Sequence, residues 1–436
     1  HLHQCCFPGA VWAQESHTLS LLHGKRHMVH GLDSAVALGN ALYVYDYIRH
    51  RYNILSNFRL DHRFEPAYCP PMDRARLLWV KKHMPRTNKW LSAMPRLSGV
   101  RLSCSVHLDA KMIPFFEGLL QKDVELFLTT CNPTTVRDEV VEYLRSAGAR
   151  VVARRGMSKK ELEDSYHAAI EWGPSHLCEM GADLSRVAAG RLRPGILAGL
   201  EATGSGITAL NNIDLPYPVF NWDDLPVKEG LHNRYMVGLS VWQAFCNRTG
   251  LSLHGMKVLV VGFGSVGRGV AEAARAFGGT VSVAEVDGAR RMEATYGGWP
   301  TGELKHLVGE ADVVATATGV AGVVGRSVID SLKPGAFLVN AGHAAHEIDV
   351  AALQRFPSSP AVPFVTEYTR PGGKPVYLFA DGAMANLTAG EGDSINSFDL
   401  TLAVLTAAII FVSCEGTEYP PGLHPLPPSV WRPVVY

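Results

Sequence analysis

Three glycines, Gly262, Gly264 and Gly267, stand in the spacing G-x-G-x-x-G directly after the apolar run 257-KVLVVG-262. The residues that follow are rich in alanine and have the pattern of a helix. In such a turn the first glycine allows the tight bend and the second lets a pyrophosphate approach the backbone. The third lets the helix pack closely on the strand. The helix amides then face the phosphates, so the stretch predicts a dinucleotide site.

An acid at the end of the next predicted strand, Glu285 in 280-TVSVAE-285, indicates which dinucleotide binds. A carboxylate there accepts hydrogen bonds from the ribose hydroxyls and repels a 2′-phosphate, so NAD is expected rather than NADP. A glycine-rich turn without a ligand is the alternative interpretation of the glycines alone. Strand, glycines, helix, second strand and acid nevertheless agree in order and spacing, which favours NAD binding.

Other residues able to do chemistry cluster in four stretches: 104-CSVHLDA-110, 221-NWDDLPVKEGLHNRYMVG-238, 316-TATG-319 and 340-NAGHAAHEID-349. Each residue in them also has an ordinary interpretation. Lys228 taken alone is a solvated loop lysine, and His107 taken alone is a core histidine at a strand end. Only their joint placement around the glycine turn favours a catalytic role.

The eight cysteines show no spacing typical of a metal site or a disulfide framework. We therefore expect reduced thiols and no metal. They are Cys5, Cys6, Cys69, Cys104, Cys131, Cys178, Cys246 and Cys414.

The elements that would position these residues alternate between strand and helix patterns from Asp73 onward, which predicts an α/β fold. Strands are expected at 100–106, 124–130 and 149–154, and again at 257–262, 280–285, 312–318 and 336–342. We expect two doubly wound parallel-sheet domains, a split substrate domain and a Rossmann NAD domain. The expected order is an N-terminal extension over 1–72, a substrate-binding domain over 73–236 and 376–418, the NAD domain over 237–375, and a tail over 419–436.

Composition excludes several classes of protein. Of the 436 residues 47% are hydrophobic and 19% charged, with zero formal net charge, so a large core is expected and no nucleic-acid or membrane partner is indicated. The longest apolar run, 402-LAVLTAAIIFV-412, is too short to span a bilayer and predicts a buried helix. The first residues, HLHQCCFPGAVWAQ, do not have the pattern of a secretory signal. A soluble cytoplasmic protein is expected.

Together, the glycine turn and the four stretches resemble the S-adenosylhomocysteine hydrolase family over roughly residues 73–425. The resemblance implies tightly held NAD, which transiently oxidises the 3′-hydroxyl of an adenine nucleoside. A ketone there acidifies the neighbouring C4′–H, which is otherwise far too weak an acid to lose its proton. The 5′ substituent is then eliminated, water adds to the alkene, and the ketone is reduced back.

The resemblance also implies roles for individual residues. Lys228 matches the lysine that takes part in oxidation of the 3′-hydroxyl, and Asn233 matches the asparagine that supports it and the cofactor. His107 matches a histidine near the 5′ end of the substrate, and His343 one close to the nicotinamide and the sugar. The further cofactor contacts expected on this basis are Thr203, Ser205, Ser265, Val266, Thr318, Gly319, Asn340, Gly342 and Asn386.

The chain departs from the family around the sugar. His232 stands where the family has an aspartate that polarises the sugar. Met180 stands where the family has a second aspartate, with Glu179 and Asp183 nearby. Ala202 aligns with the glutamate that holds the ribose hydroxyls, and Glu201 is its nearest stand-in.

The departures extend to the parts that close the site. Leu108-Asp109 replaces a Met-Thr pair whose threonine helps hold the substrate, so that Asp109 becomes a candidate for substrate binding. The loop 388-TAGEGDSINSF-398 has no histidine, and the tail lacks the lysine and tyrosine that complete a neighbouring subunit's cofactor site. Family members form tetramers, and a homo-oligomer, either a dimer or a tetramer, is expected here.

The altered half is the half that recognises homocysteine, which predicts another substrate. We expect net loss of water from an adenine nucleoside with a free terminal hydroxyl, a reaction of nucleoside-antibiotic biosynthesis of the angustmycin type. Lys228 is then base and acid at the 3′-oxygen, and His107 protonates the leaving hydroxyl with His343 or a water. His232 is a candidate for the C4′ base. The alternatives are S-adenosylhomocysteine hydrolysis in a rearranged site and a non-catalytic NAD-binding regulator.

Overall fold

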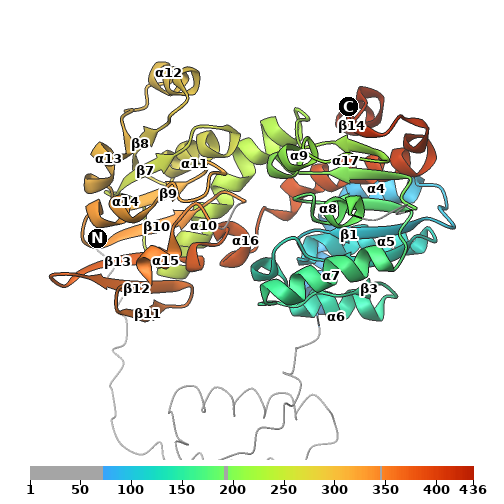
Figure 1. The fold of residues 1–436 in the computed structure, drawn as a ribbon, viewed down its shortest axis with the longest axis horizontal. Helices are drawn as coiled ribbons and strands as arrows, with labels where there is room; N and C mark the ends of the chain where they lie inside the picture. Colours follow the sequence, from blue (N-terminus) through green and yellow to red (C-terminus); the bar gives the residue numbers. More distant parts are fainter. Residues whose placement is uncertain (1–71, 191–194, 344–345) are drawn as a thin grey trace, which may run out of the picture. The chain divides into compact units, whose positions relative to one another are not determined.

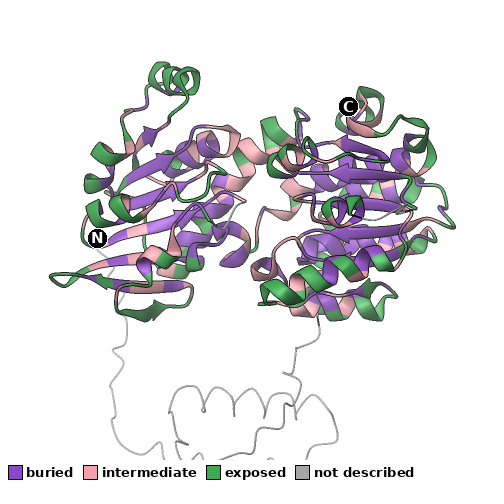
Figure 2. Cartoon of the chain, viewed as in Figure 1, coloured by how far each residue is buried: buried purple, intermediate pink, exposed green. Residues whose placement is uncertain are grey.

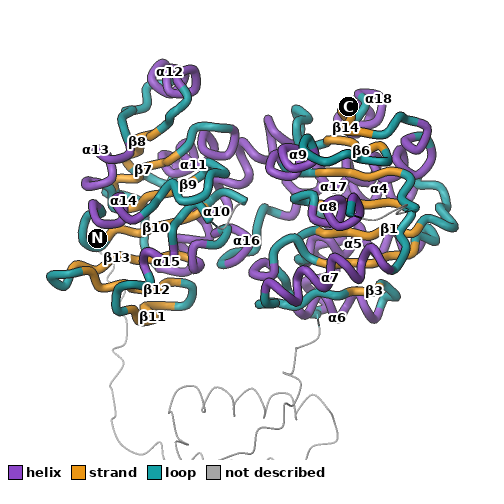
Figure 3. Tube along the Cα trace, viewed as in Figure 1, coloured by secondary structure: helices purple, strands orange, loops and turns teal. Residues whose placement is uncertain are grey.

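The structure is a computed structural model that describes residues 72–190, 195–343 and 346–436 (Figure 1). The expected N-terminal extension, except Met72, lies outside the described residues, as do Cys5, Cys6 and Cys69. The five cysteines that are described are free thiols. Two seven-stranded sheets form the framework, each enclosed by helices (Figure 3).

The first sheet is parallel throughout, in the order β14-β6-β5-β4-β1-β2-β3. The order changes direction between β4 and β1, which makes their carboxyl ends the expected place for a ligand. The strands are β1 (Arg101–Ser105), β2 (Glu125–Thr129), β3 (Arg150–Val151), β4 (His176–Glu179), β5 (Ala198–Glu201), β6 (Pro218–Asn221) and β14 (Gly422–Pro425).

The second sheet has the order β11-β12-β13-β10-β9-β7-β8. Its change of direction lies between β7 and β9, beside the predicted glycine turn. The strand β12 pairs antiparallel with both of its neighbours, β11 and β13, which the sequence did not predict. The strands are β7 (Lys257–Val261), β8 (Thr280–Ala284), β9 (Val313–Thr316), β10 (Ala336–Asn340), β11 (Ser358–Val362), β12 (Val365–Arg370) and β13 (Lys374–Phe379).

Helices cover both sheets, and the strands between them are largely buried (Figure 2). The first lobe, which we define as the first sheet with its helices, has α3 (Arg74–Lys82), α4 (Pro85–Ala93), α5 (Ile113–Gln121), α6 (Asp138–Ser146), α7 (Lys159–Glu171), α8 (Asp183–Ala189), α9 (Gly204–Leu210), α17 (Ile395–Cys414) and α18 (Pro428–Val435). The second lobe has α10 (Val237–Thr249), α11 (Ser265–Ala276), α12 (Gly288–Tyr296), α13 (Leu304–Leu307), α14 (Arg326–Ser331), α15 (Val350–Leu353) and α16 (Ala385–Thr388).

The apolar run 402–412 lies in the middle of α17, which is 20 residues long. By length and composition α17 alone among the described helices could cross a membrane, but 67% of its most apolar window is buried inside the protein. It packs with α4 and α18 in the core of the first lobe. The predicted buried helix is therefore present, and it is longer than the apolar run.

The lobes do not divide the chain quite where the sequence pattern placed the boundaries. The strand β13 pairs with β10 and β12 in the second sheet, so it continues past the expected boundary at residue 375. Residues 419–436, expected as a tail, supply β14 to the edge of the first sheet and α18 to α17. The hydrophobic pattern of these two short segments is too brief to reveal either partner.

Between the lobes the chain forms η3 (Lys228–Met236), a helix of the π type that leads directly into α10. It packs against α11, and glycines allow the close approach. A Cβ on Gly269 would lie 1.7 Å from the carbonyl oxygen of Arg234, and a Cβ on Gly238 would lie 2.3 Å from that of Gly269. The packing of α11 thus fixes the helix that carries Lys228, His232 and Asn233.

Candidate active site

A single cavity of about 1170 Å³ contains most of the predicted site residues. It lies at the carboxyl ends of strands from both sheets. His107 follows β1, Met180 follows β4, and Gly262 follows β7. These are the points at which each sheet reverses its strand order, where α/β folds bind ligands.

The glycine turn has the geometry that a dinucleotide requires. Gly262 has φ +95°, a left-handed conformation that favours glycine, and a Cβ there would lie 2.6 Å from the Ala317 carbonyl oxygen. A Cβ on Gly267 would lie 2.0 Å from the carbonyl oxygen of Gly262, so this glycine serves the packing and does not line the cavity. Gly264 faces open space apart from Arg290 Nη1 at 3.8 Å. The turn therefore leaves room for a pyrophosphate at Gly264, beside Ser265 and Val266 at the start of α11.

Glu285 is held in place by backbone amides. Its carboxylate accepts hydrogen bonds from the amides of Phe263 (2.6 Å), Val286 (2.7 Å) and Asp287 (2.9 Å), and it lines the cavity. A carboxylate has about four lone-pair positions, so capacity remains for ribose hydroxyls. The side chain is thus suited to the role that the sequence assigned to it.

Most of the residues predicted for the nicotinamide half line the cavity, but one of them stabilises a neighbouring loop instead. Thr203, Ser205, Thr318, Gly319, Gly342 and Asn386 line the cavity. The Oδ1 atom of Asn386 is buried without a hydrogen-bond partner among the described residues, which fits a carboxamide donor on a bound nicotinamide. Asn340 does not line the cavity. Its side chain accepts from the Gly342 amide (2.9 Å) and donates to the Gly382 carbonyl (3.0 Å), so it shapes the loop instead.

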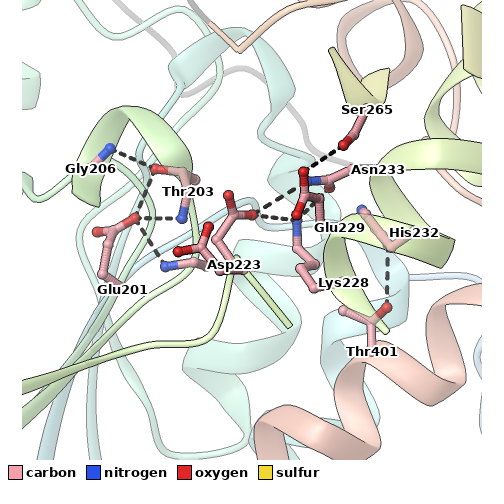
Figure 4. A network of polar contacts seen from close by, with 12 residues as sticks. Glu201, Thr203, Gly206, Asp223, Lys228, Glu229, His232, Asn233, Ser265 and Thr401 are labelled. Carbon is pink, nitrogen blue, oxygen red and sulfur yellow. Dashed lines mark hydrogen bonds and ion pairs between the residues drawn. The ribbon is translucent and has the colours of Figure 1, made fainter. Parts of the chain in front are cut away.

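Lys228 lies at the centre of a polar cluster (Figure 4). Its Nζ donates to Asn233 Oδ1 at 2.7 Å and lies 3.3 Å from Asp223 Oδ1. The amide of Asn233 also reaches Asp223 Oδ1, at 3.4 Å. Lys228 is therefore not a solvated loop lysine, because only 12% of its side chain is exposed and two groups fix its Nζ atom.

His107 and His343 form a second cluster in the cavity, with ring centroids 5.9 Å apart. His107 Nδ1 lies 2.8 Å from Thr135 Oγ1, and Cys131 Sγ lies 3.6 Å from the same nitrogen. Burial lowers the pKa of His107 to about 3, assisted by the positive charge of His343, Lys228 and Lys111. Burial and Lys228 also lower the pKa of His343. Both imidazoles are therefore neutral near pH 7.

His232 is bound on both sides. Its Nε2 lies 3.1 Å from Asp393 Oδ2 and its Nδ1 lies 3.3 Å from Thr401 Oγ1. Burial lowers the pKa of His232 to about 4, and the neighbouring Asp393 raises it only in part. In this arrangement His232 has no nitrogen free for a substrate proton. Its contacts join η3 to α17 and to the loop before α17.

The structure places two of the predicted substrate carboxylates outside the cavity. Glu179 accepts hydrogen bonds from the amides of Leu184 (2.7 Å) and Ser185 (3.2 Å), at the start of α8. Glu201 accepts from four backbone amides, those of Gly181, Ala182, Ala202 and Thr203. Both side chains are almost fully buried and do not line the cavity, so they support the loops beneath it.

Asp109, also predicted to bind substrate, does line the cavity but is engaged by one neighbour. Its Oδ1 accepts from the Lys111 amide (2.8 Å) and its Oδ2 lies 3.0 Å from Lys111 Nζ. Lys111 is itself buried and donates to the Glu391 carbonyl at 2.6 Å. Asp109 therefore orients a buried lysine at the cavity wall.

Comparison with known proteins agrees with this geometry. Residues 233–392 match the model of the S-adenosyl-L-homocysteine hydrolase NAD-binding domain. The chain is 32% identical over 373 residues to the S-inosyl-L-homocysteine hydrolase of Methanopyrus kandleri, which covers 83% of this chain and 88% of that protein. It is 34% identical over 365 residues to the adenosylhomocysteinase of Thermotoga maritima, covering 81% and 90%.

The chain belongs to the S-adenosyl-L-homocysteine hydrolase family. It is an NAD-dependent enzyme of this family, and the residues around the glycine turn fit the cofactor. The NAD would be held by the amides near Gly264, by Glu285, and by the cavity-lining residues predicted for the nicotinamide half. These are Thr203, Ser205, Thr318, Gly319, Gly342 and Asn386. The resemblance inferred from the motifs is thereby confirmed.

Several residues of the site were not predicted from the sequence. Glu347 is fully buried and accepts from the amides of Thr318 and Gly319, both at 2.8 Å. Asp393, Lys111 and Asp223 line the cavity. Asp223 stands five residues before Lys228 in a stretch already singled out, so its charge was a usable signal. Asp393 is distant from His232 in sequence, and only the fold brings them together.

Proposed function

We propose that the enzyme transiently oxidises the 3′-hydroxyl of an adenine nucleoside and eliminates its 5′-hydroxyl, with net loss of water. The observation that carries this is the meeting of the Lys228–Asn233–Asp223 cluster, the neutral His107–His343 pair and the NAD turn in one cavity. The product is an exocyclic 4′,5′-alkene, as expected for nucleoside-antibiotic biosynthesis.

Residues of the chain itself carry out the proton transfers. Lys228, in its neutral form, accepts the proton of the 3′-hydroxyl and returns it when the ketone is reduced. NAD, when bound, would supply the acceptor for the C3′ hydride, and the overall reaction is redox-neutral because the 3′-ketone is reduced again. The neutral His107–His343 pair accepts the C4′ proton and delivers a proton to the departing 5′-oxygen, which leaves as water.

The pKa of His107 bears on the order of these steps. A group with a pKa of about 3 cannot begin as a protonated acid at pH 7, so His107 can protonate the leaving oxygen only after it has gained a proton. The C4′–H supplies one as soon as the 3′-carbon is a ketone. His232 does not transfer a proton in this scheme, because its nitrogens face Asp393 and Thr401. It stabilises the cavity wall instead.

The second candidate is hydrolysis of a thioether nucleoside. It is favoured by the names of the relatives, a S-inosyl-L-homocysteine hydrolase and an adenosylhomocysteinase. Mass spectrometry on the NAD-loaded enzyme with a panel of adenine nucleosides separates the two. A product lighter by one water is expected. Rapid thiol release from S-adenosylhomocysteine, with no such product from any nucleoside, would refute the dehydration.

A further inference from the structure

We propose that Thr135 is a positioning residue that holds His107 in one tautomer, with the proton on Nδ1 and the lone pair of Nε2 available to the cavity. The inference deepens the proposed function and rests on it, because it assumes that His107 takes the C4′ proton. Thr135 belongs to none of the four stretches that the sequence analysis singled out, and it does not line the cavity. It acts only through His107.

The first step concerns the place of Thr135 in the fold. It ends η2 (Pro133–Thr135), a short helical turn whose N-cap residue, Asn132, accepts from the Thr134 amide at 3.0 Å. Thr135 is only 1% exposed. Its Oγ1 lies 2.8 Å from the carbonyl oxygen of Asn132 and 2.8 Å from Nδ1 of His107. The hydroxyl is thus held between a carbonyl and an imidazole.

The second step counts the protons in this chain of contacts. The hydroxyl of Thr135 has one proton, and the Asn132 carbonyl has none. If that proton pointed to His107, two acceptor oxygens would face each other at 2.8 Å with no hydrogen between them. Donation to Asn132 removes this repulsion and leaves a lone pair of Oγ1 toward His107. Nδ1 is therefore the donor, which assigns the proton of the neutral ring to Nδ1.

The third step concerns the other ring nitrogen. Because the Nδ1 edge of His107 is turned to Thr135, the Nε2 edge is the one available to the cavity that His107 lines. Among the described residues, Cys131 Sγ at 3.7 Å is the polar atom in contact with Nε2. A thiol is a weak hydrogen-bond partner, so the lone pair of Nε2 remains able to take a proton from a ligand.

This tautomer suits the proton transfers of the proposed reaction. Nε2 takes the proton of C4′ as the C4′–H bond breaks. The same N–H gives its proton to the 5′-oxygen as the C5′–O bond breaks and water leaves, and Nδ1 keeps its proton throughout. Between the two transfers the ring is a cation, and a charged donor makes a stronger hydrogen bond to Oγ1 than a neutral one. Thr135 therefore stabilises the ring most while it holds the substrate's proton.

The opposite tautomer would block the first transfer, because a neutral His107 with its proton on Nε2 presents a donor to the cavity. Thr135→Val keeps the shape of the side chain but leaves Nδ1–H without its acceptor, so we expect the ring proton to move to Nε2. Removal of the C4′ proton should then slow by about 10- to 100-fold. Oxidation at C3′ does not use His107 and should continue.

Exchange of H4′ with solvent measures this step. NAD-loaded enzyme is incubated with adenosine in heavy water, and loss of the H4′ signal is followed by proton NMR. In Thr135→Val the exchange is expected to slow by about 10- to 100-fold. The rate at which adenosine reduces the bound NAD should stay within about 3-fold of wild type. Thr135→Ser retains the hydroxyl and should restore the exchange.

The matched control is Thr134→Val. The Thr134 hydroxyl lies 2.8 Å from both Asn132 Oδ1 and Thr388 Oγ1, so this change loosens the same turn without removing the contact to His107. It should keep the wild-type exchange. If Thr134→Val slowed exchange as much as Thr135→Val, or if Thr135→Val slowed NAD reduction and exchange equally, the effect would be one of loop structure and the positioning role would be refuted.

The tautomer can be determined without turnover. In enzyme labelled with nitrogen-15 histidine, nitrogen–proton correlation spectra distinguish a protonated Nδ1 from a protonated Nε2, and His107→Asn identifies the signals of His107. We expect a protonated Nδ1 in wild type and Thr135→Ser, and a protonated Nε2 in Thr135→Val. A protonated Nε2 in wild type, or an unchanged tautomer in Thr135→Val, overturns the proposal.

Failure of the proposed function would look different. A wild type in which adenosine neither reduces NAD nor exchanges H4′ refutes the oxidation, whereas the spectra still decide whether Thr135 sets the tautomer. If the tautomer changes in Thr135→Val but the exchange does not, Thr135 has no part in the proton transfer.

Discussion

Lys228 shows how far single residues depend on their neighbours in this site. A lysine in a polar loop is ordinarily solvated, yet here Asn233 and Asp223 hold the Nζ atom of Lys228 at the cavity wall. The contacts orient the side chain toward a bound hydroxyl before any substrate arrives. Such preorganisation is what a proton-transfer group requires.

Replacing Lys228 by methionine is expected to slow reduction of the bound NAD by adenosine about 10²- to 10⁴-fold, because the base for the 3′-hydroxyl is lost. NAD itself should remain bound, since the glycine turn and Glu285 are unchanged. Stopped-flow absorbance of the reduced nicotinamide measures the rate. The control is Lys160→Met, because Lys160 is 83% exposed on α7. Wild-type rates in Lys228→Met would rule out its role as base.

For single residues, the sequence predicted which side chains line the cavity well where a motif fixes the backbone. It predicted this poorly where a side chain can adopt either of two orientations. His107, Lys228, Asn233 and His343 follow recognisable motifs and meet in the cavity. Glu201 ends a strand at the correct edge of the sheet, but its side chain turns toward the amides of neighbouring loops. Nothing in the residue pattern distinguishes these orientations, because both satisfy a carboxylate at a strand end.

The buried pair Glu179 and Glu201, neighbours on β4 and β5, gives a prediction about pH. Burial and the charge of Glu201 raise the pKa of Glu179 from 4.5 to about 8, and burial raises that of Glu201 to about 7. The folded protein keeps protons that the unfolded chain releases near pH 4.5. This contribution to stability is fully present below that pH and is lost as the pH rises through about 7 to 8.

The free energy of unfolding is therefore expected to fall from about pH 4.5 up to about pH 7 to 8, by about 1.4 kcal/mol per pH unit for each proton that the folded protein retains and the unfolded chain has released. Glu179→Gln should make this fall shallower, because a neutral amide replaces the protonated acid. Urea unfolding at a series of pH values gives the slopes. Glu163→Gln, exposed on α7, should keep the wild-type slope. An unchanged slope in Glu179→Gln would show that Glu179 does not hold the proton.

Among the elements, η3 is the one on which the site most depends. None of its residues is fully buried, so its position comes from its backbone contact with α11 and from side-chain contacts such as that of Arg234, which pairs with Glu272 at 2.6 Å. The strands that the sequence predicted, β1–β3 and β7–β10, have continuous apolar runs that end at turns, whereas β4–β6 and β11–β14 were not predicted. A π-helix has no such pattern, which explains why its sequence predicted function without predicting its conformation.

Gly269→Ala tests this dependence. The added methyl would meet the Arg234 carbonyl, so η3 must move away from α11 and carry Lys228 with it. We expect the free energy of unfolding to fall by about 1–3 kcal/mol. The rate at which adenosine reduces the bound NAD is expected to fall by a larger proportion. Chemical denaturation and stopped-flow absorbance measure the two effects.

The matched control for Gly269→Ala is Gly288→Ala at the start of α12, where no atom lies within 4 Å of the added methyl. It should leave stability unchanged or raise it by up to about 1 kcal/mol, since alanine favours a helix. If Gly269→Ala behaved in the same way, the close contact between α11 and η3 would not be what positions Lys228.

At the scale of the whole molecule, the cavity is lined by residues from both sheets, so a cofactor bound in it would contact each lobe. Thr203 and Ser205 come from the first lobe, and Gly264, Glu285 and Thr318 come from the second. The sequence motifs also predict shared binding, because the predicted cofactor residues lie on both sides of the predicted boundary at residue 236. Bound NAD should therefore stabilise the two lobes together.

The thermal unfolding of NAD-free protein is expected to move to higher temperature with added NAD, as one transition. The gain is about 2.7 kcal/mol at a concentration 100 times the dissociation constant. Gly262→Ala should abolish the shift, because its φ of +95° is strained for alanine and the methyl meets the Ala317 carbonyl. Gly309→Ala should keep the shift, since its nearest contact is an ordinary 3.6 Å. Two separate transitions, of which NAD moved only one, would mean that the cofactor stabilises a single lobe.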